Sequence, residues 1–181
     1  MRLTIEPRGK KEVIMVEGAT QEDILPGSFR NFRGEKRTFN DAGKRNFNLA
    51  LNLPTEALDD LVALGLNIKE TKGNEEYGDE PTRFVKVNVQ YDSKIPPELY
   101  LVTKKNTKEL TQGELGLLDG ARFSNVDLII NTYHKEEGKC SLWLQKGYFT
   151  IEQDPITAKY QNLNFDALDA EDDDSDDAPW G

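Results

Sequence analysis

The chain has 181 residues, of which 36% are hydrophobic and 31% are charged, and its formal net charge is −10. This length suits one globular domain with an appendage. The single cysteine, Cys140, excludes an internal disulfide, and no apolar run is long enough to cross a membrane. Residues 1–12 contain no apolar signal core, so the sequence predicts a cytoplasmic protein with no membrane partner.

The negative charge is concentrated near the C-terminus. Eight of the 33 acidic residues fall in residues 166–181, which contain no Lys or Arg. Residues 1–160 keep all 23 basic residues against 25 acidic ones, a net charge of −2. Clustered acids repel one another and bury little apolar surface. We therefore expect one folded domain over residues 1–160 and a disordered acidic tail over residues 161–181.

Alternation of apolar and polar residues, which is typical of half-buried strands, dominates the chain. It predicts strands at residues 13–16, 29–33, 44–52, 84–91, 99–103, 126–130 and 141–151, with a bulge at Gly147 in the last. The clearest predicted buried faces are Phe47, Leu49 and Leu51 in one strand, and Val85, Val87, Val89 and Tyr91 in another.

Helical signals are few. Residues 54–64 begin with a proline and end before Gly65, which predicts one helix, with Leu58, Leu61, Val62 and Gly65 on one face. A second short helix is predicted within residues 109–118, a loop at residues 72–81 and a turn at residues 92–97. The fold class predicted is mainly β: an OB-fold-like, five-stranded, partly open barrel with one or two short helices and a disordered C-terminal tail. A plain β-sandwich is the alternative.

A local basic patch interrupts the near-neutral domain between Ser28 and Ala50. Single-stranded nucleic acid is bound by cations that follow the backbone and by aromatic rings that stack on bases. The patch supplies both, and we expect phosphate contacts from Arg30, Arg33, Lys36, Arg37, Lys44 and Arg45 and base stacking from Phe32 and Phe39. The alternative is that these phenylalanines belong to the core, as alternation predicts for Phe47.

Trp143 is a further candidate for base stacking. Strand alternation places Leu142 and Leu144 on one face and Trp143 on the other, so the indole lies either in a groove or in the core of a strand buried on both faces. The same argument adds Lys86 and Tyr100 as DNA-binding candidates, and Lys104 and Lys105 as groove-edge or solvated residues.

The tail combines a polyanion with an aromatic residue. Its candidate partner-binding residues are Asp172, Asp173, Asp174, Asp176, Asp177 and Trp180. A tryptophan beside clustered acids suits docking on a basic-rimmed pocket of a partner protein, and the acids can compete with DNA for the chain's own basic groove. The alternative is a tail that only adds solubility.

The sequence offers few residues of the types that carry catalysis or bind metals. His134 and Cys140 are the only residues of their kinds and lie in no catalytic motif, and there is no phosphate-binding glycine-rich loop and no zinc ligand set. We therefore expect no enzyme activity, cofactor or metal. Two alternatives remain: a nuclease using the scattered Asp92, Asp119 and Asp127, and an acidic protein that mimics DNA and inhibits a DNA-processing enzyme.

Several segments together resemble a known family, the small single-stranded DNA-binding proteins of tailed bacteriophages. They are residues 30–34, 43–47, 67–69, 87–91 with Pro96 and Pro97, 125–130 and 148–152, within a resemblance running from about Phe29 to Tyr160. The resemblance implies an OB-fold core that coats single-stranded DNA during phage replication and recombination, without catalysis. It also implies that the tail recruits phage or host replication and recombination proteins. Two departures are the penultimate Trp180, where such tails tend to end on phenylalanine, and residues 1–21, which match no family segment.

Overall fold

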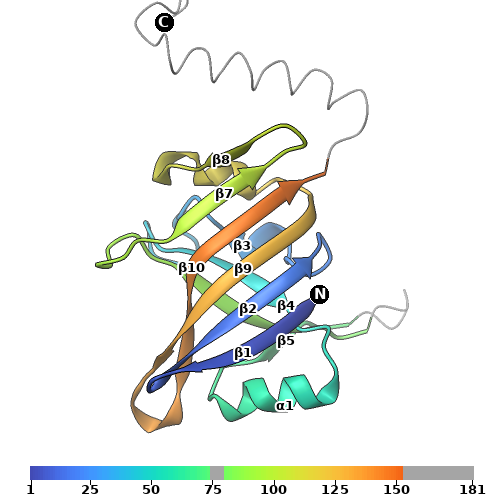
Figure 1. Cartoon of the computed structure of the whole chain (residues 1–181), viewed down its shortest axis with the longest axis vertical. Helices are drawn as coiled ribbons and strands as arrows, with labels where there is room; N and C mark the ends of the chain where they lie inside the picture. Colours follow the sequence, from blue (N-terminus) through green and yellow to red (C-terminus); the bar gives the residue numbers. More distant parts are fainter. Residues whose placement is uncertain (74–79, 153–181) are drawn as a thin grey trace, which may run out of the picture. The chain divides into compact units, whose positions relative to one another are not determined.

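The computed structural model describes residues 1–73 and 80–152, and residues Met1–Ile151 form one compact unit built around a single large sheet (Figure 1). The sheet holds ten strands. They are β1 (Arg2–Arg8), β2 (Lys11–Ala19), β3 (Arg30–Asn31), β4 (Arg45–Ala50), β5 (Lys69–Glu70), β6 (Arg83–Val89), β7 (Glu98–Val102), β8 (Thr107–Glu109), β9 (Phe123–His134) and β10 (Cys140–Ile151).

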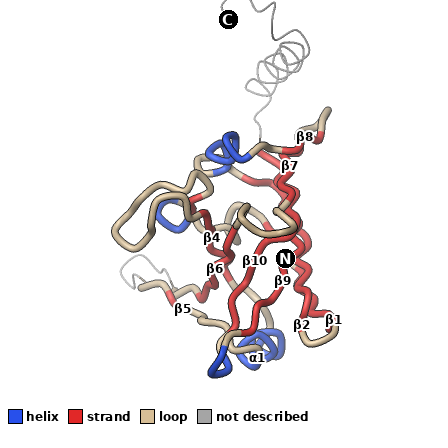
Figure 2. Tube along the Cα trace, turned by 90° about the vertical axis from the view of Figure 1, so that its left-hand side faces the viewer, coloured by secondary structure: helices blue, strands red, loops and turns tan. Residues whose placement is uncertain are grey.

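Strand β10 organises the sheet. The main order is β1-β2-β9-β10-β6-β4-β3, and Figure 2 shows β4 and β6 on one side of β10 and β9, β2 and β1 on the other. The N-terminal half of β10 pairs in parallel with β6, and its C-terminal half pairs in parallel with β7. Along its whole length β10 also pairs antiparallel with β9. Strands from the first, middle and last parts of the described residues therefore meet in one sheet.

The helical segments are short and lie at the edges of the sheet. The α-helix α1 covers Thr55–Ala63, and 3₁₀ helices cover η1 (Gly27–Phe29), η3 (Gln112–Leu118) and η4 (Glu136–Gly138). Helix α1 follows Pro54 and ends before Gly65, whose φ of +89° only glycine adopts readily. A Cβ at this position would collide with the carbonyl oxygen of Gly138. The end of α1 is therefore locked against the turn between β9 and β10.

The core follows the predicted alternation in two strands. Phe47, Leu49 and Leu51 are buried, as are Val85, Val87 and Val89, while the residues between them face outward, apart from Ala50 and Phe84. The Phe32 ring stacks on Phe47 at 5.1 Å, and the edge of Phe149 meets Phe32 at 5.6 Å. These aromatic contacts join β4, β10 and the loop after β3.

The predicted fold class is confirmed: the chain is mainly β, partly open and carries short helices, including α1 and η3 at the two predicted places. The sheet has more strands than the five-stranded barrel, because strands β1, β5 and β8 join those at the seven predicted places. The predicted tail and the domain boundary at residue 160 lie outside the described residues, as does most of the predicted loop at residues 72–81.

Two local predictions are wrong. The strand predicted at residues 29–33 is reduced to Arg30–Asn31, because Phe29 closes the 3₁₀ turn η1. The bulge in β10 falls between Leu144 and Lys146 instead of at Gly147. Gly147 is needed for a different reason, since a Cβ there would lie 2.6 Å from Cε2 of Phe149. Along the predicted helix face, Leu61 is buried and Leu58 is half-buried, while 60% of the Val62 surface is exposed.

Candidate nucleic-acid interface

A groove with a volume of about 1290 Å³ crosses the outer face of β4, β6 and β10. Its remaining walls come from the loop before β4, the segment between α1 and β5, and the β9–β10 turn. The cationic residues that line it are Lys44, Arg45, Lys69, Lys86, Lys135 and Lys139, against the acidic Asp41 and Asp92. Its aromatic residues are Phe39, Tyr91 and Trp143. The groove therefore combines excess positive charge with rings.

Strand pairing aligns the floor of the groove. Asn46 on β4 lies opposite Asn88 on β6, and Asn88 is in register with Trp143 on β10. Residues in register on adjacent strands share a face and lie about 5 Å apart. Since Phe47, Val87 and Leu142 are buried, alternation turns the neighbouring side chains into the groove. One row of side chains thus crosses three strands.

Trp143 belongs to the groove and not to a core buried on both faces. The indole is partly exposed between the buried Leu142 and Leu144, and its Nε1 donates a hydrogen bond to Oγ of Ser141 at 3.1 Å. This bond fixes the edge of the indole while the ring lines the groove. Asn88 holds the adjacent strand by donating from Nδ2 to the carbonyl oxygen of Leu142 at 3.0 Å. The ring is therefore presented on a rigid support.

Lys86 stands at the centre of a group of like charges. Burial lowers its pKa, and the positive charges of Lys69, Lys135 and Lys44 lower it further. Lys44 pairs with Asp41 at 3.4 Å, but this pair is widely exposed. Within the part of the chain that the structure describes, Lys69, Lys86 and Lys135 form no ion pair. Such unneutralised cations favour binding of a polyanion.

Arg45 and Tyr91 meet in the groove lining. The guanidinium carbon of Arg45 lies 5.9 Å from the centroid of the Tyr91 ring. Nε of Arg45 and Oη of Tyr91 are both buried without a hydrogen-bond partner among the described residues. Burial raises the pKa of Tyr91, although the Arg45 charge opposes that shift. Buried polar groups without a hydrogen-bond partner are rare in folded proteins, so this pair needs an explanation, and a bound ligand would provide one.

Phe39 lines the groove from a tightly bonded loop. Its ring is fully exposed at the tip of a turn closed by hydrogen bonds between the backbones of Arg37 and Asn40. The Asn40 side chain donates to the carbonyl oxygens of Glu35, Asp41 and Lys44 and accepts from Asn46. An exposed phenylalanine on an anchored loop offers an open face for stacking.

Arg30 is not a DNA contact, contrary to the prediction from sequence. The residue is 1% exposed, and its guanidinium donates to the carbonyl oxygens of Leu25, Ile24, Leu118 and Ala121 and to Oε1 of Gln21. It also lies over the Phe123 ring at 4.6 Å. Burial lowers the pKa of Arg30 to about 10, while Asp119 acts in the opposite direction. Arg30 therefore ties together the loops on which the basic segment rests.

Phe32 is a core residue, so the prediction that it stacks on a base is also wrong. None of its surface is exposed, and the ring packs against Phe47 and Phe149. Asp119 draws the backbone at this point inward, since its carboxylate accepts from the amides of Phe32 at 2.8 Å and Arg33 at 3.1 Å. A ring enclosed in this way has no free face.

Some of the other predicted contacts line the groove and some do not. Phe39, Lys44, Arg45, Lys86 and Trp143 line the groove together. Tyr100 stacks on Tyr148 at 4.8 Å and bonds to Glu98, and the exposed Lys104 and Lys105 lie between β7 and β8, outside the groove lining. Arg33, Lys36 and Arg37 also lie outside the groove lining. Arg33 pairs with Glu35, and Lys36 is exposed. Arg37 donates to the backbone carbonyl oxygens of Ser28 and Arg30.

Sequence reasoning missed Lys69, Lys135, Lys139 and the groove position of Tyr91. Lys69 lies in β5, whereas Lys135 and Lys139 lie in the β9–β10 turn, so no single local cluster marks the three lysines. Tyr91 follows the inward alternation of β6, but it lies beyond the end of the strand.

The described residues contain no group of three or more His, Cys, Asp or Glu side chains placed to hold a metal ion. The three aspartates of the nuclease alternative have different surroundings. Asp119 accepts hydrogen bonds from two backbone amides, and Asp127 accepts from the Gly18 amide and the Asn125 side chain. Asp92 borders the groove. None of the helices in residues 1–73 and 80–152 has the length and apolar character needed to cross a bilayer.

Residues 8–181 match the family model described as "Putative phage ssDNA-binding domain". The chain belongs to this family of phage single-stranded DNA-binding domains. A solved structure, the C-terminally truncated single-stranded DNA-binding protein of bacteriophage Enc34, is similar over 85% of this chain and 98% of that chain, with 12% sequence identity and a TM-score of 0.45. No curated protein matches the chain. The family assignment rests on the family model and agrees with the resemblance found in the sequence.

Proposed function

We propose that this phage protein coats single-stranded DNA during DNA replication and recombination in the host cytoplasm, binding it in the groove of β4, β6 and β10 without catalysis. The observation that carries the proposal is the combination of six cationic side chains with Phe39, Tyr91 and Trp143 in one groove. Cations follow the phosphates and rings stack on bases of any sequence. Duplex DNA hides its base faces within the stack, so this chemistry favours unpaired strands.

The binding we propose depends little on base sequence. The groove lysines are flexible point charges suited to phosphates, and an aromatic face accepts every base. We further propose that the tail acids and Trp180 recruit replication or recombination proteins of the phage or host, as the clustered charge and terminal aromatic suggest. The acids can also compete with DNA for the groove, since both are polyanions.

The test is a fluorescence-anisotropy titration of labelled oligo-dT of about 30 nucleotides, at low and moderate salt, with unlabelled duplex as competitor. We expect tight binding that weakens with salt and that duplex displaces poorly. The same titration with residues 166–181 removed should give equal or higher affinity. Absence of binding by both forms at low salt would refute the proposal. Lower affinity without the tail would contradict competition between tail and DNA.

A further inference from the structure

The row of side chains that crosses the groove continues onto β9. Trp143 lies opposite Asn131, and Ser141, which lines the groove, lies opposite Tyr133. Directly opposed residues on antiparallel strands share a face. The Tyr133 ring, 51% exposed, therefore lies on the groove face, one strand spacing of about 5 Å beyond the groove lining. Its neighbour Lys135 lines the groove itself.

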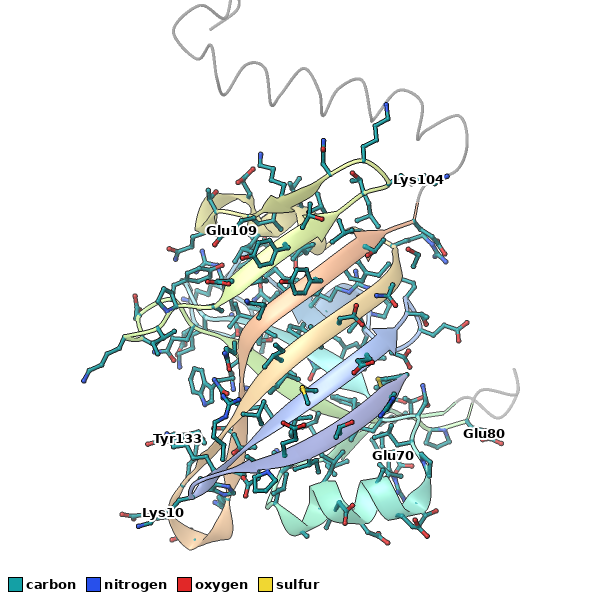
Figure 3. All side chains as sticks on the ribbon, viewed as in Figure 1. Lys10, Glu70, Glu80, Lys104, Glu109 and Tyr133 are labelled. Atoms are coloured by element: carbon teal, nitrogen blue, oxygen red, sulfur yellow. The ribbon has the colours of Figure 1, made fainter. Side chains whose placement is uncertain are left out.

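The next strand adds positive charge beside Tyr133. Val13 on β2 lies opposite Asn131, so continuing the antiparallel register by two residues brings Lys11 opposite Tyr133. Two contacts hold this register: the Glu12 amide donates to Oγ1 of Thr132 at 2.9 Å, and the Glu12 carboxylate pairs with His134. Figure 3 shows Tyr133 and Lys10 at the same corner of the sheet.

The tip of the β1–β2 hairpin is basic and fully open to solvent. Arg8, Lys10 and Lys11 are exposed, and Gly9 provides the tight turn with a φ of +64°. The nearest acids on the same hairpin are the exposed Glu6, and Glu12, which His134 already engages. Glu136 and Glu137 follow in η4, where Glu137 faces Lys139 at 3.9 Å. Tyr133 is thus an open ring with cations on both sides, Lys135 toward the groove and Lys11 toward the hairpin.

We infer that single-stranded DNA leaves the groove across β9, where Tyr133 stacks on a base, and reaches the hairpin tip, where Lys10 and Lys11 contact phosphates. This inference rests on the proposed function and extends its site. It assigns a binding role to the first strands of the chain. Lysines alone at the hairpin tip would attract any polyanion. The exposed Tyr133 ring beside them adds a preference for unpaired bases.

The test compares exposed tyrosines on the same sheet with oligo-dT of increasing length, from about 4 to about 30 nucleotides. Tyr133→Ser should bind the shortest oligonucleotides like the unchanged chain and should lose at least about fivefold in affinity once the strand is long enough to reach β9. Tyr133→Phe, which keeps the ring, should restore the affinity. Tyr148→Ser is the matched control, because Tyr148 is 36% exposed on β10 but outside the groove lining.

The hairpin lysines are tested by salt dependence. Removing two phosphate contacts from a single strand lowers the slope of log affinity against log salt by roughly 1.4. Lys10→Ala with Lys11→Ala should produce this fall with long oligonucleotides only, and Lys104→Ala with Lys105→Ala is the control pair. If the unchanged chain binds long oligo-dT but Tyr133→Ser and the hairpin pair behave like it at every length, the inference is wrong while the proposed function stands. A loss that is equal at all lengths also overturns it. Absence of binding by the unchanged chain would instead refute the proposed function.

Discussion

The guanidinium of Arg45 lies over the Tyr91 ring at 5.9 Å, and each side chain keeps a buried polar atom without a partner among the described residues. An unsatisfied buried donor costs about 1–3 kcal/mol. A phosphate oxygen in the groove would offer the Arg45 guanidinium a stronger partner than the Tyr91 ring does.

Reversing the charge of Arg45 tests whether the groove binds the phosphate backbone of DNA independently of base sequence. We expect Arg45→Glu to weaken binding of oligo-dT, oligo-dA and mixed sequences to the same extent, and to lower the salt slope by about 0.7 for the lost phosphate. Arg33→Glu is the control, since Arg33 is exposed, pairs with Glu35 and lies outside the groove lining. Anisotropy titrations at several salt concentrations measure both effects. A loss confined to one sequence would indicate base readout.

Trp143 offers a direct optical test of stacking. The chain has two tryptophans, so Trp180→Phe leaves Trp143 as the only indole emitter. Adding oligo-dT should then quench the fluorescence, because the base covers the exposed ring. Trp143→Ala should lower the affinity by fivefold or more, about 1–3 kcal/mol, with little change in thermal stability. Unchanged emission at saturating DNA would mean that the indole does not stack.

Lys86 links binding to pH-dependent stability. Burial and the neighbouring lysines lower its pKa in the folded chain. The unfolded chain therefore holds this proton more tightly, so the charged Lys86 destabilises the fold at neutral pH. The penalty is relieved as pH rises from the lowered folded value toward the ordinary value of 10.5.

We accordingly expect Lys86→Gln to raise the midpoint of thermal unfolding at pH 7 and to lose this advantage near pH 10.5, while weakening DNA binding. Thermal melts across this pH range and anisotropy at pH 7 measure the two effects. Lys105→Gln, on the exposed turn after β7, should alter neither. A lower melting point for Lys86→Gln at pH 7 would contradict the argument.

A substitution of Arg30 tests whether this residue stabilises the fold or contacts DNA. Arg30→Met removes the guanidinium that donates to four backbone carbonyl oxygens and to the side-chain oxygen of Gln21. We expect this change to lower the free energy of unfolding by about 3 kcal/mol. Chemical denaturation measures this loss. DNA affinity of the folded fraction at low temperature should stay close to that of the unchanged chain. Reduced affinity with full stability would return Arg30 to the binding surface.

Alternation predicted much of the core because it is a local property. The period of two in residues 44–52 and 84–91 follows from strand geometry alone, and the burial of Phe47 and Val87 agrees with it. The same rule turned Lys86 and Trp143 outward, toward the groove that the strands then build. Local pattern therefore predicted the groove residues that sit within regular strands.

Residues outside regular strands were harder to predict. The neighbours of Phe32 are polar, yet the Asp119 carboxylate, 87 residues away, binds the backbone at this point and buries the ring. Lys69 and Lys135 lie near Lys86 because the end of α1 packs against the β9–β10 turn. Contacts of this range leave no periodic signal in the sequence.

Strand β10 pairs with β9, β6 and β7. The sheet therefore cannot be completed during synthesis until β10 has been made. A nascent chain that ends before Cys140 contains the hairpin β1–β2 and strand β6 but has neither Trp143 nor the strand that joins the two halves. Such long-range pairing forms late, because the entropy of closing large loops opposes it. The groove proposed to bind DNA is therefore completed late in folding, and a chain released from the ribosome before Trp143 would lack part of the groove lining.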